Sequence, residues 1–222
     1  MLEAKRLTKR FDGVVAVDDL SITVRHGEAV GLQGPNGSGK TTLLDLLSGQ
    51  LKPDGGEIYF RGQRVTGFRP SRLVHRGIAR TFQIPRPIPR LTVSEQVMAA
   101  RLHLGEPWSV VRGKAEAILQ QSGLTSFAFV PTRWLSQGAL RRLELARALA
   151  TSPSMLLVDE PFASLSGADK TELVTLLEKV REQQTSIVLV AHNPGAFGTL
   201  VDRILVLHAG RIVDELPPVP RR

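Results

Sequence analysis

The residues with the clearest chemistry form a glycine-rich stretch, GPNGSGKTT, at positions 34–42. It matches the pattern G-x-x-x-x-G-K-[ST], in which successive backbone N–H groups point at phosphate oxygens. Lys40 would bring a full positive charge to the β- and γ-phosphates of a nucleotide, and the hydroxyl of Thr41 can bind Mg²⁺. The stretch therefore predicts a phosphate site. Its members are Gly34, Pro35, Asn36, Gly37, Ser38, Gly39, Lys40, Thr41 and Thr42.

Two adjacent carboxylates are the second chemical feature. Asp159 and Glu160 end the run MLLVDE, whose apolar residues are typical of a strand buried on both faces. Open α/β sheets bind ligands at the carboxyl ends of their parallel strands. Asp159 is therefore predicted to hold the Mg²⁺ shell, and Glu160 to orient and activate an attacking water. Alone, two adjacent acids would more often begin a solvated loop; the phosphate loop favours the catalytic interpretation.

A third stretch, LSQGALRRLELARALA at 135–150, leads from a small-residue loop into a basic helix. Ser136 offers a hydroxyl, and the helix after Gly138 adds free N–H groups and its dipole. These features predict a second anion site. It suits the side of the terminal phosphate opposite the phosphate loop, where another copy of the chain could supply it.

Apolar patterning indicates the elements that position these groups. Residues 2–33 are predicted to form strands, 40–49 a helix, and 56–65 a hairpin with Gly62 in its turn. PSRLVHRG is predicted to be a short helix and IARTFQ a strand. Three prolines at 84–90 then exclude a helix interior or a central strand.

The rest of the chain is predicted to be helical to residue 149, after which strands and helices alternate. This order favours a single α/β domain with a helical insertion. Residues 1–83 and 151–222 would form the β subdomain and the ATP-binding core. Residues 84–150 would form a helical subdomain that ends in the LSQGA loop and its helix.

Composition limits the partners. The net charge is +8, but two tryptophans and one tyrosine offer nucleic-acid bases few rings to stack on, which disfavours direct nucleic-acid binding. The chain has no cysteine, which excludes disulfides and fits a cytoplasmic protein. No apolar run approaches the ~20 residues that cross a bilayer, so we expect no transmembrane segment.

Taken in order, the motifs resemble those of the ATP-binding subunit of an ABC transporter, over nearly the full length of the chain. That family combines a phosphate loop, a glutamine after a strand, an LSGGQ loop, an Asp-Glu pair and a late histidine. This sequence has GPNGSGKTT, Gln83, LSQGA, Asp159-Glu160 and His192. The stretch GIARTFQIPRPIPRLTVSEQV at 77–97, with RRLELARALA, is similar to branched-chain amino acid uptake ATPases.

The resemblance implies a P-loop NTPase fold with an N-terminal antiparallel β subdomain. It also implies that two ATP-binding subunits, identical or paralogous, stack head to tail around two ATP molecules. Ser136 and Gly138 of one subunit would contact the γ-phosphate held by Lys40 of the other. Closure by ATP and release on hydrolysis would drive transmembrane permease subunits.

Further roles follow from the same resemblance. Gln83 matches the glutamine that senses Mg²⁺, and His192 matches the histidine that contacts the γ-phosphate. Phe11 lies where the family places an aromatic ring under the adenine; a core phenylalanine is the equal alternative. The prolines after Gln83 resemble the surface that receives a permease, with a rigid surface loop as the equal alternative. The implied catalytic residues are Glu160, His192 and Lys40, and the implied Mg²⁺ ligands are Thr41, Gln83 and Asp159.

The sequence also departs from the family pattern. Gln137 and Ala139 stand where glycine and glutamine are usual, and Ser166 and Asn193 stand where aspartate is common. We expect the Cβ of Gln137 to restrict the loop, because glycine tolerates backbone conformations that other residues avoid. None of the changes removes a primary phosphate, metal or catalytic group.

The sequence thus predicts a cytoplasmic ATPase, peripheral on the inner face of the membrane, that serves an importer of branched-chain amino acids or a related small polar solute. A soluble ABC ATPase acting on ribosomes or nucleic acid is an alternative, which a single phosphate loop and the lack of sustained heptads disfavour. A weakly hydrolysing regulatory subunit is another. The altered LSQGA loop favours it, and the intact Asp159-Glu160 pair argues against it.

Overall fold

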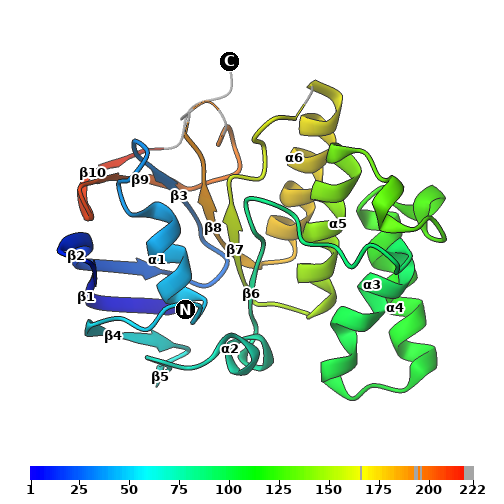
Figure 1. Ribbon diagram of the computed structural model, residues 1–222, viewed down its shortest axis with the longest axis horizontal. Helices are drawn as coiled ribbons and strands as arrows, with labels where there is room; N and C mark the ends of the chain where they lie inside the picture. The colour runs from blue at the N-terminus through cyan, green and yellow to red at the C-terminus, as the bar shows by residue number, and fades with distance from the viewer. Residues whose placement is uncertain (166, 193–194, 196, 218–222) are drawn as a thin grey trace.

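Two β-sheets with a helix between them form the frame of the molecule (Figure 1). The computed structural model describes residues 1–165, 167–192, 195 and 197–217. The larger sheet has the strand order β10-β9-β3-β8-β7-β6, and the smaller sheet has the order β2-β1-β4-β5. The strands are β1 (Leu2–Phe11), β2 (Val14–Val24), β3 (Ala29–Gln33), β4 (Gly55–Phe60), β5 (Gln63–Arg64), β6 (Ile78–Arg80), β7 (Met155–Asp159), β8 (Ser186–Val190), β9 (Arg203–His208) and β10 (Arg211–Leu216).

The larger sheet is parallel except at β10, which pairs antiparallel with β9. Every residue of β7 and β8 is buried, because packed side chains cover both faces of the sheet. This confirms the parallel strands expected from the runs MLLV and SIVLV. The carboxyl ends of β3, β7 and β8 meet at one edge, where a ligand site is expected.

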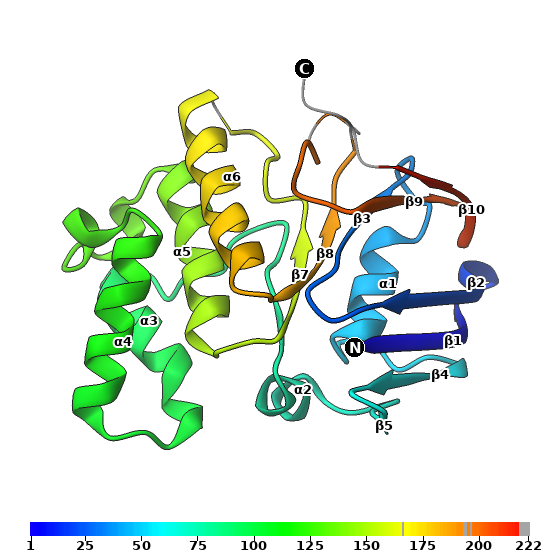
Figure 2. The same cartoon turned by 180° about the vertical axis from the view of Figure 1, so that it is seen from behind.

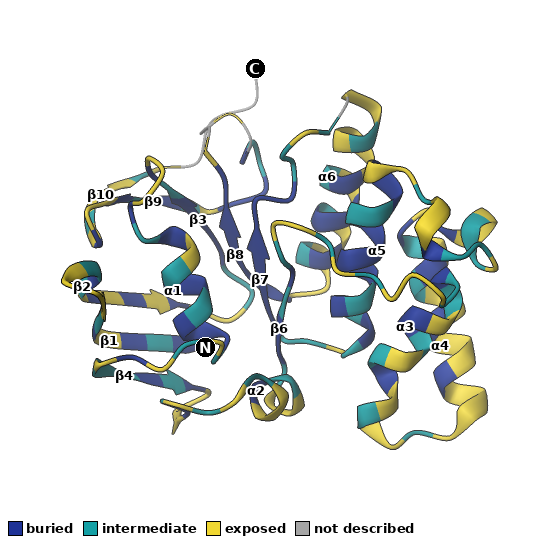
Figure 3. Ribbon diagram, viewed as in Figure 1, coloured by how far each residue is buried: buried dark blue, intermediate teal, exposed yellow. Residues whose placement is uncertain are grey.

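Helix α1 (Lys40–Leu47) lies between the two sheets, and its leucines share one core with strands of both (Figure 3). The opposite face of the larger sheet packs against α6 (Gly167–Glu182) and one side of α5 (Gln137–Ala150), as seen from behind in Figure 2. Leu145 of α5 and Leu173 of α6 belong to this second core. The phosphate-loop helix and the helix after the LSQGA loop therefore lie on opposite faces of one sheet.

A helical region lies beside the larger sheet and has a core of its own (Figure 1). It contains α3 (Val93–Arg101), α4 (Trp108–Gln121), the outer side of α5 and short 3₁₀ turns. Helix α3 starts at a capping box in which Thr92 and Glu95 exchange side-chain-to-backbone hydrogen bonds. No helix in the described part of the chain is long and apolar enough to cross a membrane.

Two local expectations differ from the structure. The strand expected over IARTFQ ends at Arg80, and Gln83 lies beyond it in an irregular segment. The prolines that follow cannot donate to a strand ladder, so the segment stays irregular until α3. Helix α2 (Pro70–Arg76) forms as expected and ends at Gly77. The short helix expected after β8 lies partly outside the described residues, and the described residues 197–202 form turns rather than a helix. The tail 218–222 lies wholly outside them.

Candidate active site

The phosphate loop connects β3 to α1 at the carboxyl edge of the larger sheet (Figure 1). Gly39 precedes α1 at φ 103°, and a Cβ there would lie 2.3 Å from the carbonyl oxygen of Ala16. Glycine alone suits a position with a left-handed backbone and so close a neighbour. Lys40 is buried, and its Nζ donates to the carbonyl oxygens of Gly34 and Pro35, each at 2.8 Å. No side chain caps α1, so the N–H groups of its first turn remain available to an anion.

Asp159, the last residue of β7, lies in a buried ion-pair network. Nη2 of Arg80 donates to Oδ2 of Asp159 at 3.2 Å, while Nη1 contacts Asp45 of α1 and, at 3.0 Å, Oγ of Ser48. Arg80 therefore ties β6, β7 and the phosphate-loop helix together. Burial raises the pKa of Asp159, and the positive charge of Arg80 opposes that rise. The sequence did not single out Arg80, because its partners depend on which strands are neighbours.

Electrostatics links the phosphate loop to the two acids. Burial lowers the pKa of Lys40, while the negative charges of Glu160 and Asp159 act in the opposite direction. Both carboxylates therefore act on the lysine across the edge of the sheet. A charged group perturbed by specific partners in this way is typical of a functional site.

Glu160 follows β7 in a left-handed conformation, φ 45°, which residues other than glycine seldom adopt. Its carboxylate is held from two sides: Nε2 of Gln83 donates to Oε2 at 3.0 Å, and Nε2 of His192 lies 2.7 Å from Oε1. Glu160 is 8% exposed, whereas 48% of the His192 side chain is exposed. Three residues predicted from separate motifs thus meet beyond the ends of β6, β7 and β8. Backbone strain at such a point is common in active sites.

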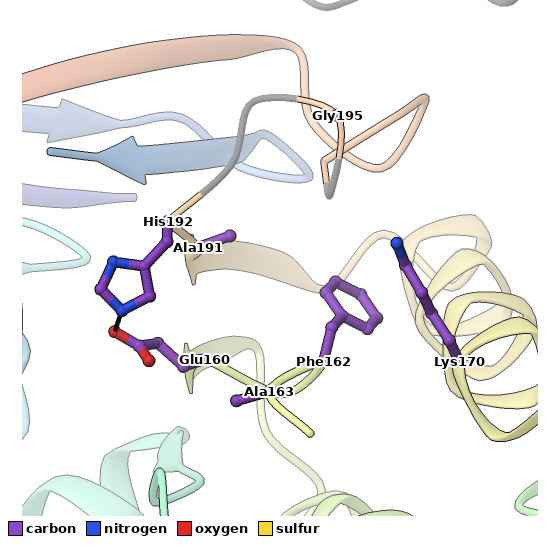
Figure 4. A pocket seen from close by; sticks show the side chains of 7 residues that line it. All are labelled: Glu160, Phe162, Ala163, Lys170, Ala191, His192 and Gly195. Carbon is purple, nitrogen blue, oxygen red and sulfur yellow. Dashed lines mark ion pairs between the residues drawn. The ribbon is translucent and has the colours of Figure 1, made fainter. Parts of the chain in front are cut away.

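A cavity of about 340 Å³ opens beside Glu160 (Figure 4). Glu160 and His192 lie at one end, and Phe162 and Lys170 at the other, with Nζ of Lys170 5.9 Å from the centre of the Phe162 ring. The cavity gives small polar molecules such as water a route to the Glu160 carboxylate. Its other lining residues are Ala163, Ala191 and Gly195.

The LSQGA loop ends where α5 begins. Oγ of Ser136 accepts the N–H of Ala139 at 3.2 Å and so caps the helix. Gln137 is the first helical residue and has no positive φ, so the restriction expected from its Cβ does not arise. Gly138 is buried, and a Cβ there would lie 1.9 Å from Oδ1 of Asp169 at the start of α6. Glycine is needed at 138 for space rather than for backbone freedom.

The structure does not bring this loop to the phosphate loop. Helices α1 and α5 pack on opposite faces of the larger sheet. Among the residues that the structure describes, no hydrogen bond or ion pair joins Ser136 or Gly138 to residues 34–42. A second copy is therefore the arrangement that would set Ser136 against a phosphate held by Lys40. Two departures from the family pattern, Ser166 and Asn193, lie outside the described residues.

One face of α5 holds the irregular segment after β6. Arg141 donates to the carbonyl oxygen of Phe82 at 3.4 Å, and Arg147 donates to that of Arg86 at 3.0 Å. Between them, Glu144 accepts the backbone N–H groups of Phe82 and Arg86; burial raises its pKa, and Arg147 with these N–H groups opposes the rise. The glutamine that contacts the site carboxylate lies between the two anchored residues. Motif spacing alone does not reveal this contact.

Phe11, at the end of β1, is 42% exposed. The alternative that it is a core phenylalanine is therefore wrong. Nζ of Lys9 lies 5.4 Å from the centre of its ring. A ring exposed to this extent can stack on a planar base, so adenine contact stays a prediction.

The edge of the larger sheet that carries Asp159 fits a divalent cation such as Mg²⁺. Oδ1 of Asp159 is buried and has no hydrogen-bond partner among the described residues, a state that an ion or water normally relieves. Thr41 and Gln83 add oxygen donors, the ligand type that Mg²⁺ prefers. No cluster of three or more His, Cys, Asp or Glu that could hold a metal occurs in the described part of the chain. Nucleotide phosphates and water would therefore supply the rest of the shell.

Comparison with known proteins agrees with this geometry. The family model described as ABC transporter matches residues 17–163. The chain is 38% identical over 206 residues to the sulfate/thiosulfate import ATP-binding protein CysA of Mycobacterium tuberculosis, which covers 92% of this chain and 58% of CysA. It is 32% identical to the high-affinity branched-chain amino acid transport ATP-binding protein BraF of Pseudomonas aeruginosa, which covers 98% of this chain and 92% of BraF. The chain thus spans little more than half the length of CysA and most of BraF.

Solved structures give the same result. A dimeric ATP-binding cassette in a post-hydrolysis state, bound to ADP and Pi, matches with a TM-score of 0.88 at 27% identity, over 99% of both chains. An ATP-binding cassette of an ABC transporter in its ADP conformation matches with a TM-score of 0.87 at 29% identity, over 97% of this chain and 90% of the other. These likenesses confirm the predicted fold class and its nucleotide ligand. Because the family model also covers most of the sequence, the chain belongs to the ABC transporter family of ATPases, as an ATP-binding cassette.

Proposed function

We propose that this chain is the ATP-hydrolysing subunit of an ABC importer and works as a pair of cassettes around two ATP molecules. The observation that carries the proposal is the meeting of Gln83, Glu160 and His192 at the edge of the sheet that also carries Lys40. A base, a residue that orients it and a phosphate-binding cation are the parts that phosphoryl transfer to water requires.

The binding residues act first. Residues 34–42 surround the phosphates with N–H groups, and Lys40 exchanges its two carbonyl contacts for phosphate oxygens. Phe11 stacks on the adenine. Thr41, Gln83 and Asp159 would hold Mg²⁺, which would neutralise the charge that develops on the phosphates. Arg80 favours the ionised form of the Asp159 carboxylate and orients it through a 3.2 Å hydrogen bond.

Glu160 is the general base in this proposal. It takes a proton from a water that enters through the adjoining cavity. Gln83 and His192 restrict the carboxylate to one orientation from opposite oxygens. When ATP is bound, His192, half exposed at the mouth of the site, would donate its ring N–H to the γ-phosphate in place of Glu160 and so stabilise the phosphate charge.

A second cassette completes each site. Ser136 and Gly138 of the second copy, or of a paralogue, contact the γ-phosphate through the Ser136 hydroxyl and the free N–H groups at the start of α5. Support comes from the dimeric state of a solved cassette that this chain matches over 99% of its length. The normal helical backbone at Gln137 argues against the regulatory alternative, since the altered loop is not strained.

The permease contact is proposed for residues 84–90. Ile84 is 74% exposed and Ile88 is 52% exposed, between prolines that keep the segment rigid. Exposed apolar side chains on a fixed segment favour a partner surface over a plain loop. The cassette would then lie on the cytoplasmic face of the membrane, with 84–150 as its helical subdomain and 1–83 with 151–222 as its core.

The solute is proposed to be a branched-chain amino acid or a related small polar molecule. BraF of Pseudomonas aeruginosa and LivG of Salmonella typhimurium are named for branched-chain amino acid transport, and the chain covers 92% and 89% of them. CysA is more similar in identity, but the chain covers 58% of it. These two relatives match 98% and 95% of this chain, which supports the branched-chain group.

The test is Mg²⁺-dependent ATP hydrolysis as a function of protein concentration. The wild-type rate per molecule should rise with concentration, because two copies build each site. Glu160→Gln should lower the rate roughly 100- to 10,000-fold, the usual contribution of a general base. Glu116→Gln, on the exposed face of α4, is the matched control and should leave it unchanged. A wild type that binds ATP but stays at background at every concentration would overturn the homodimer.

A further inference from the structure

The net positive charge of the chain is concentrated in one segment. Residues 58–94 contain eight arginines and no aspartate, glutamate or lysine, which gives the segment a net charge of +8. The whole chain also has a net charge of +8, from 29 Lys and Arg against 21 Asp and Glu. The remaining residues are therefore neutral overall. General enrichment in arginine would not separate charge in this way.

Most of this charge faces solvent. Five arginines, which we name the arginine face, are exposed on the β4–β5 turn, β5, α2 and the turn before α2. Among the described residues only one of the five forms an ion pair, Arg64 with Glu57 at 3.1 Å. By contrast, Arg80 is buried against Asp159 and belongs to the active site. The five residues of the arginine face are Arg61, Arg64, Arg69, Arg72 and Arg76.

The arginine face is a continuous surface. Strand β5 and helix α2 lie side by side at the edge of the molecule away from the phosphate loop (Figure 1), joined by a hydrogen bond from Arg76 to Gln63. The guanidinium of Arg72 lies 3.7 Å from the centre of the Phe68 ring, which holds it in place. Figure 3 shows α2 largely exposed. The cations are spread over a hairpin and a helix, as a contact with an extended anionic surface requires.

We propose that the arginine face binds the anionic phospholipid headgroups of the membrane on which the permease lies. The inference rests on the proposed membrane-peripheral function. Guanidinium groups bind phosphate in a bidentate manner, and basic groups near an anionic bilayer are attracted within about one Debye length. Along the chain, the charged segment runs on through Arg86 and Arg90 of the proposed permease contact.

Lipid suits this surface better than nucleic acid does. Single-stranded nucleic acid needs exposed rings for its bases to stack on. On the arginine face, Phe60 is 3% exposed and the Phe68 ring is occupied by Arg72. The arginine face can therefore contact phosphate groups but offers no ring for bases to stack on. A bilayer surface presents phosphate groups and has no bases.

The test uses the full chain and two kinds of vesicle, phosphatidylcholine alone and phosphatidylcholine mixed with phosphatidylglycerol, in co-sedimentation at about 0.15 M salt. The quadruple variant Arg61→Gln, Arg64→Gln, Arg69→Gln, Arg72→Gln removes most of the face. The wild type should bind the mixed vesicles and not the neutral ones. The variant should bind the mixed vesicles roughly 100-fold more weakly or worse, given the usual attraction per basic residue.

A second quadruple variant controls for net charge. Arg10→Gln, Arg25→Gln, Arg112→Gln and Arg133→Gln remove the same charge from exposed positions in the neutral remainder. This control should bind mixed vesicles within a few-fold of the wild type. Equal weakening in both variants, or a wild type that does not bind anionic vesicles, would overturn the inference. So would wild-type binding to single-stranded RNA in place of vesicles.

ATP hydrolysis in solution separates this inference from the proposed function. The face variant should hydrolyse ATP at the wild-type rate, because none of its four positions touches the active site. If the protein hydrolyses ATP but does not bind anionic vesicles, only the proposed lipid contact is wrong. If the protein binds anionic vesicles but does not hydrolyse ATP, the catalytic proposal is wrong and the proposed lipid contact is supported.

Discussion

The two loops that would contact ATP phosphates are built in different ways. The phosphate loop keeps every residue of its pattern, and Gly39 shows why: its left-handed backbone lies too close to Ala16 for any side chain. The LSQGA loop departs from its pattern at Gln137 and Ala139. Both of these residues are nevertheless ordinary members of α5, and Ser136 caps the helix.

The difference shows what each kind of site demands of a sequence. A loop that wraps its backbone around a ligand constrains nearly every residue, because each must permit an unusual conformation or a close approach. A site formed by a helix end takes its N–H groups from the main chain, which most residues supply equally well. Substitutions at Gln137 and Ala139 should therefore be tolerated where substitutions in the phosphate loop are not.

Among the variants that test this contrast, Lys40→Ala should have the largest effect on ATP hydrolysis. Loss of the charge that binds the phosphates should lower ATP hydrolysis by about 100-fold or more, with nucleotide binding reduced as well. ATP hydrolysis and binding of a fluorescent ATP analogue measure the two effects. Lys114→Ala, an exposed lysine on α4, should change neither. If Lys40→Ala kept a tenth of the wild-type rate, the phosphate loop would be as tolerant as the LSQGA loop.

Ser136→Ala examines the other loop and should lower hydrolysis about 10-fold or more, because the γ-phosphate loses a contact from the second copy. Mixing this variant with Lys40→Ala should restore part of the wild-type rate. One of the two sites in the mixed dimer would then combine an intact Lys40 with an intact Ser136. ATP hydrolysis of the mixture at fixed total protein is the measurement.

Two controls accompany the mixing experiment. The double variant Lys40→Ala, Ser136→Ala should not restore the rate of either single variant. Thr92→Ala removes the cap of α3, as Ser136→Ala removes that of α5, and either loss should lower the unfolding free energy by about 1 kcal/mol. Urea denaturation should therefore show similar losses, while Thr92→Ala keeps its activity. If Thr92→Ala and Ser136→Ala lost activity equally, Ser136 would serve only as the cap of α5.

Gln137→Gly restores the family residue at a position where the backbone does not need it. Glycine in the first turn should lower the unfolding free energy by about 0.5–1 kcal/mol, because it loses more conformational freedom on folding. The hydrolysis rate should not rise. Urea denaturation and ATP hydrolysis together decide this. A several-fold faster variant would mean that the side chain of Gln137 obstructs the phosphate after all.

Glu144→Gln should have the smallest effect, which is a change in how the unfolding free energy depends on pH. Burial raises the pKa of Glu144, so the folded protein binds a proton there more tightly than the unfolded chain does. Its contribution to stability is therefore full below its ordinary pKa of 4.5 and is lost as pH rises through the higher folded value. Glutamine does not titrate, so the unfolding free energy of the variant relative to the wild type should increase as pH rises from 4.5. A difference in unfolding free energy between variant and wild type that stays constant as pH rises from 4.5 would contradict this prediction.

The parts predicted well from the sequence are those that local pattern determines. The phosphate loop, the buried strands β7 and β8 and the α5 helix follow from glycine spacing and apolar periodicity within short windows. Glu160 and His192 were singled out by their order along the chain, but their 2.7 Å contact depends on β7 and β8 being neighbours.

Two features could not be predicted from the sequence. Arg80 joins Asp45 to Asp159 because β6 pairs with β7 beside α1, and single-sequence patterns carry no signal for strand order. Glu144 holds the segment that carries Gln83, although the helical pattern around it assigns it no such role. Both are buried charges whose partners come from distant parts of the chain, so packing decides them.

The left-handed backbone of Glu160 has a consequence for how the protein can change over generations. A glycine there would relax a conformation that usually costs about 1–2 kcal/mol in other residues, and would raise the stability of the fold. It would also remove the carboxylate. Selection for thermal stability alone would therefore favour Glu160→Gly and lose the reaction. Variants evolved for stability without an activity screen should therefore accept glycine at position 160.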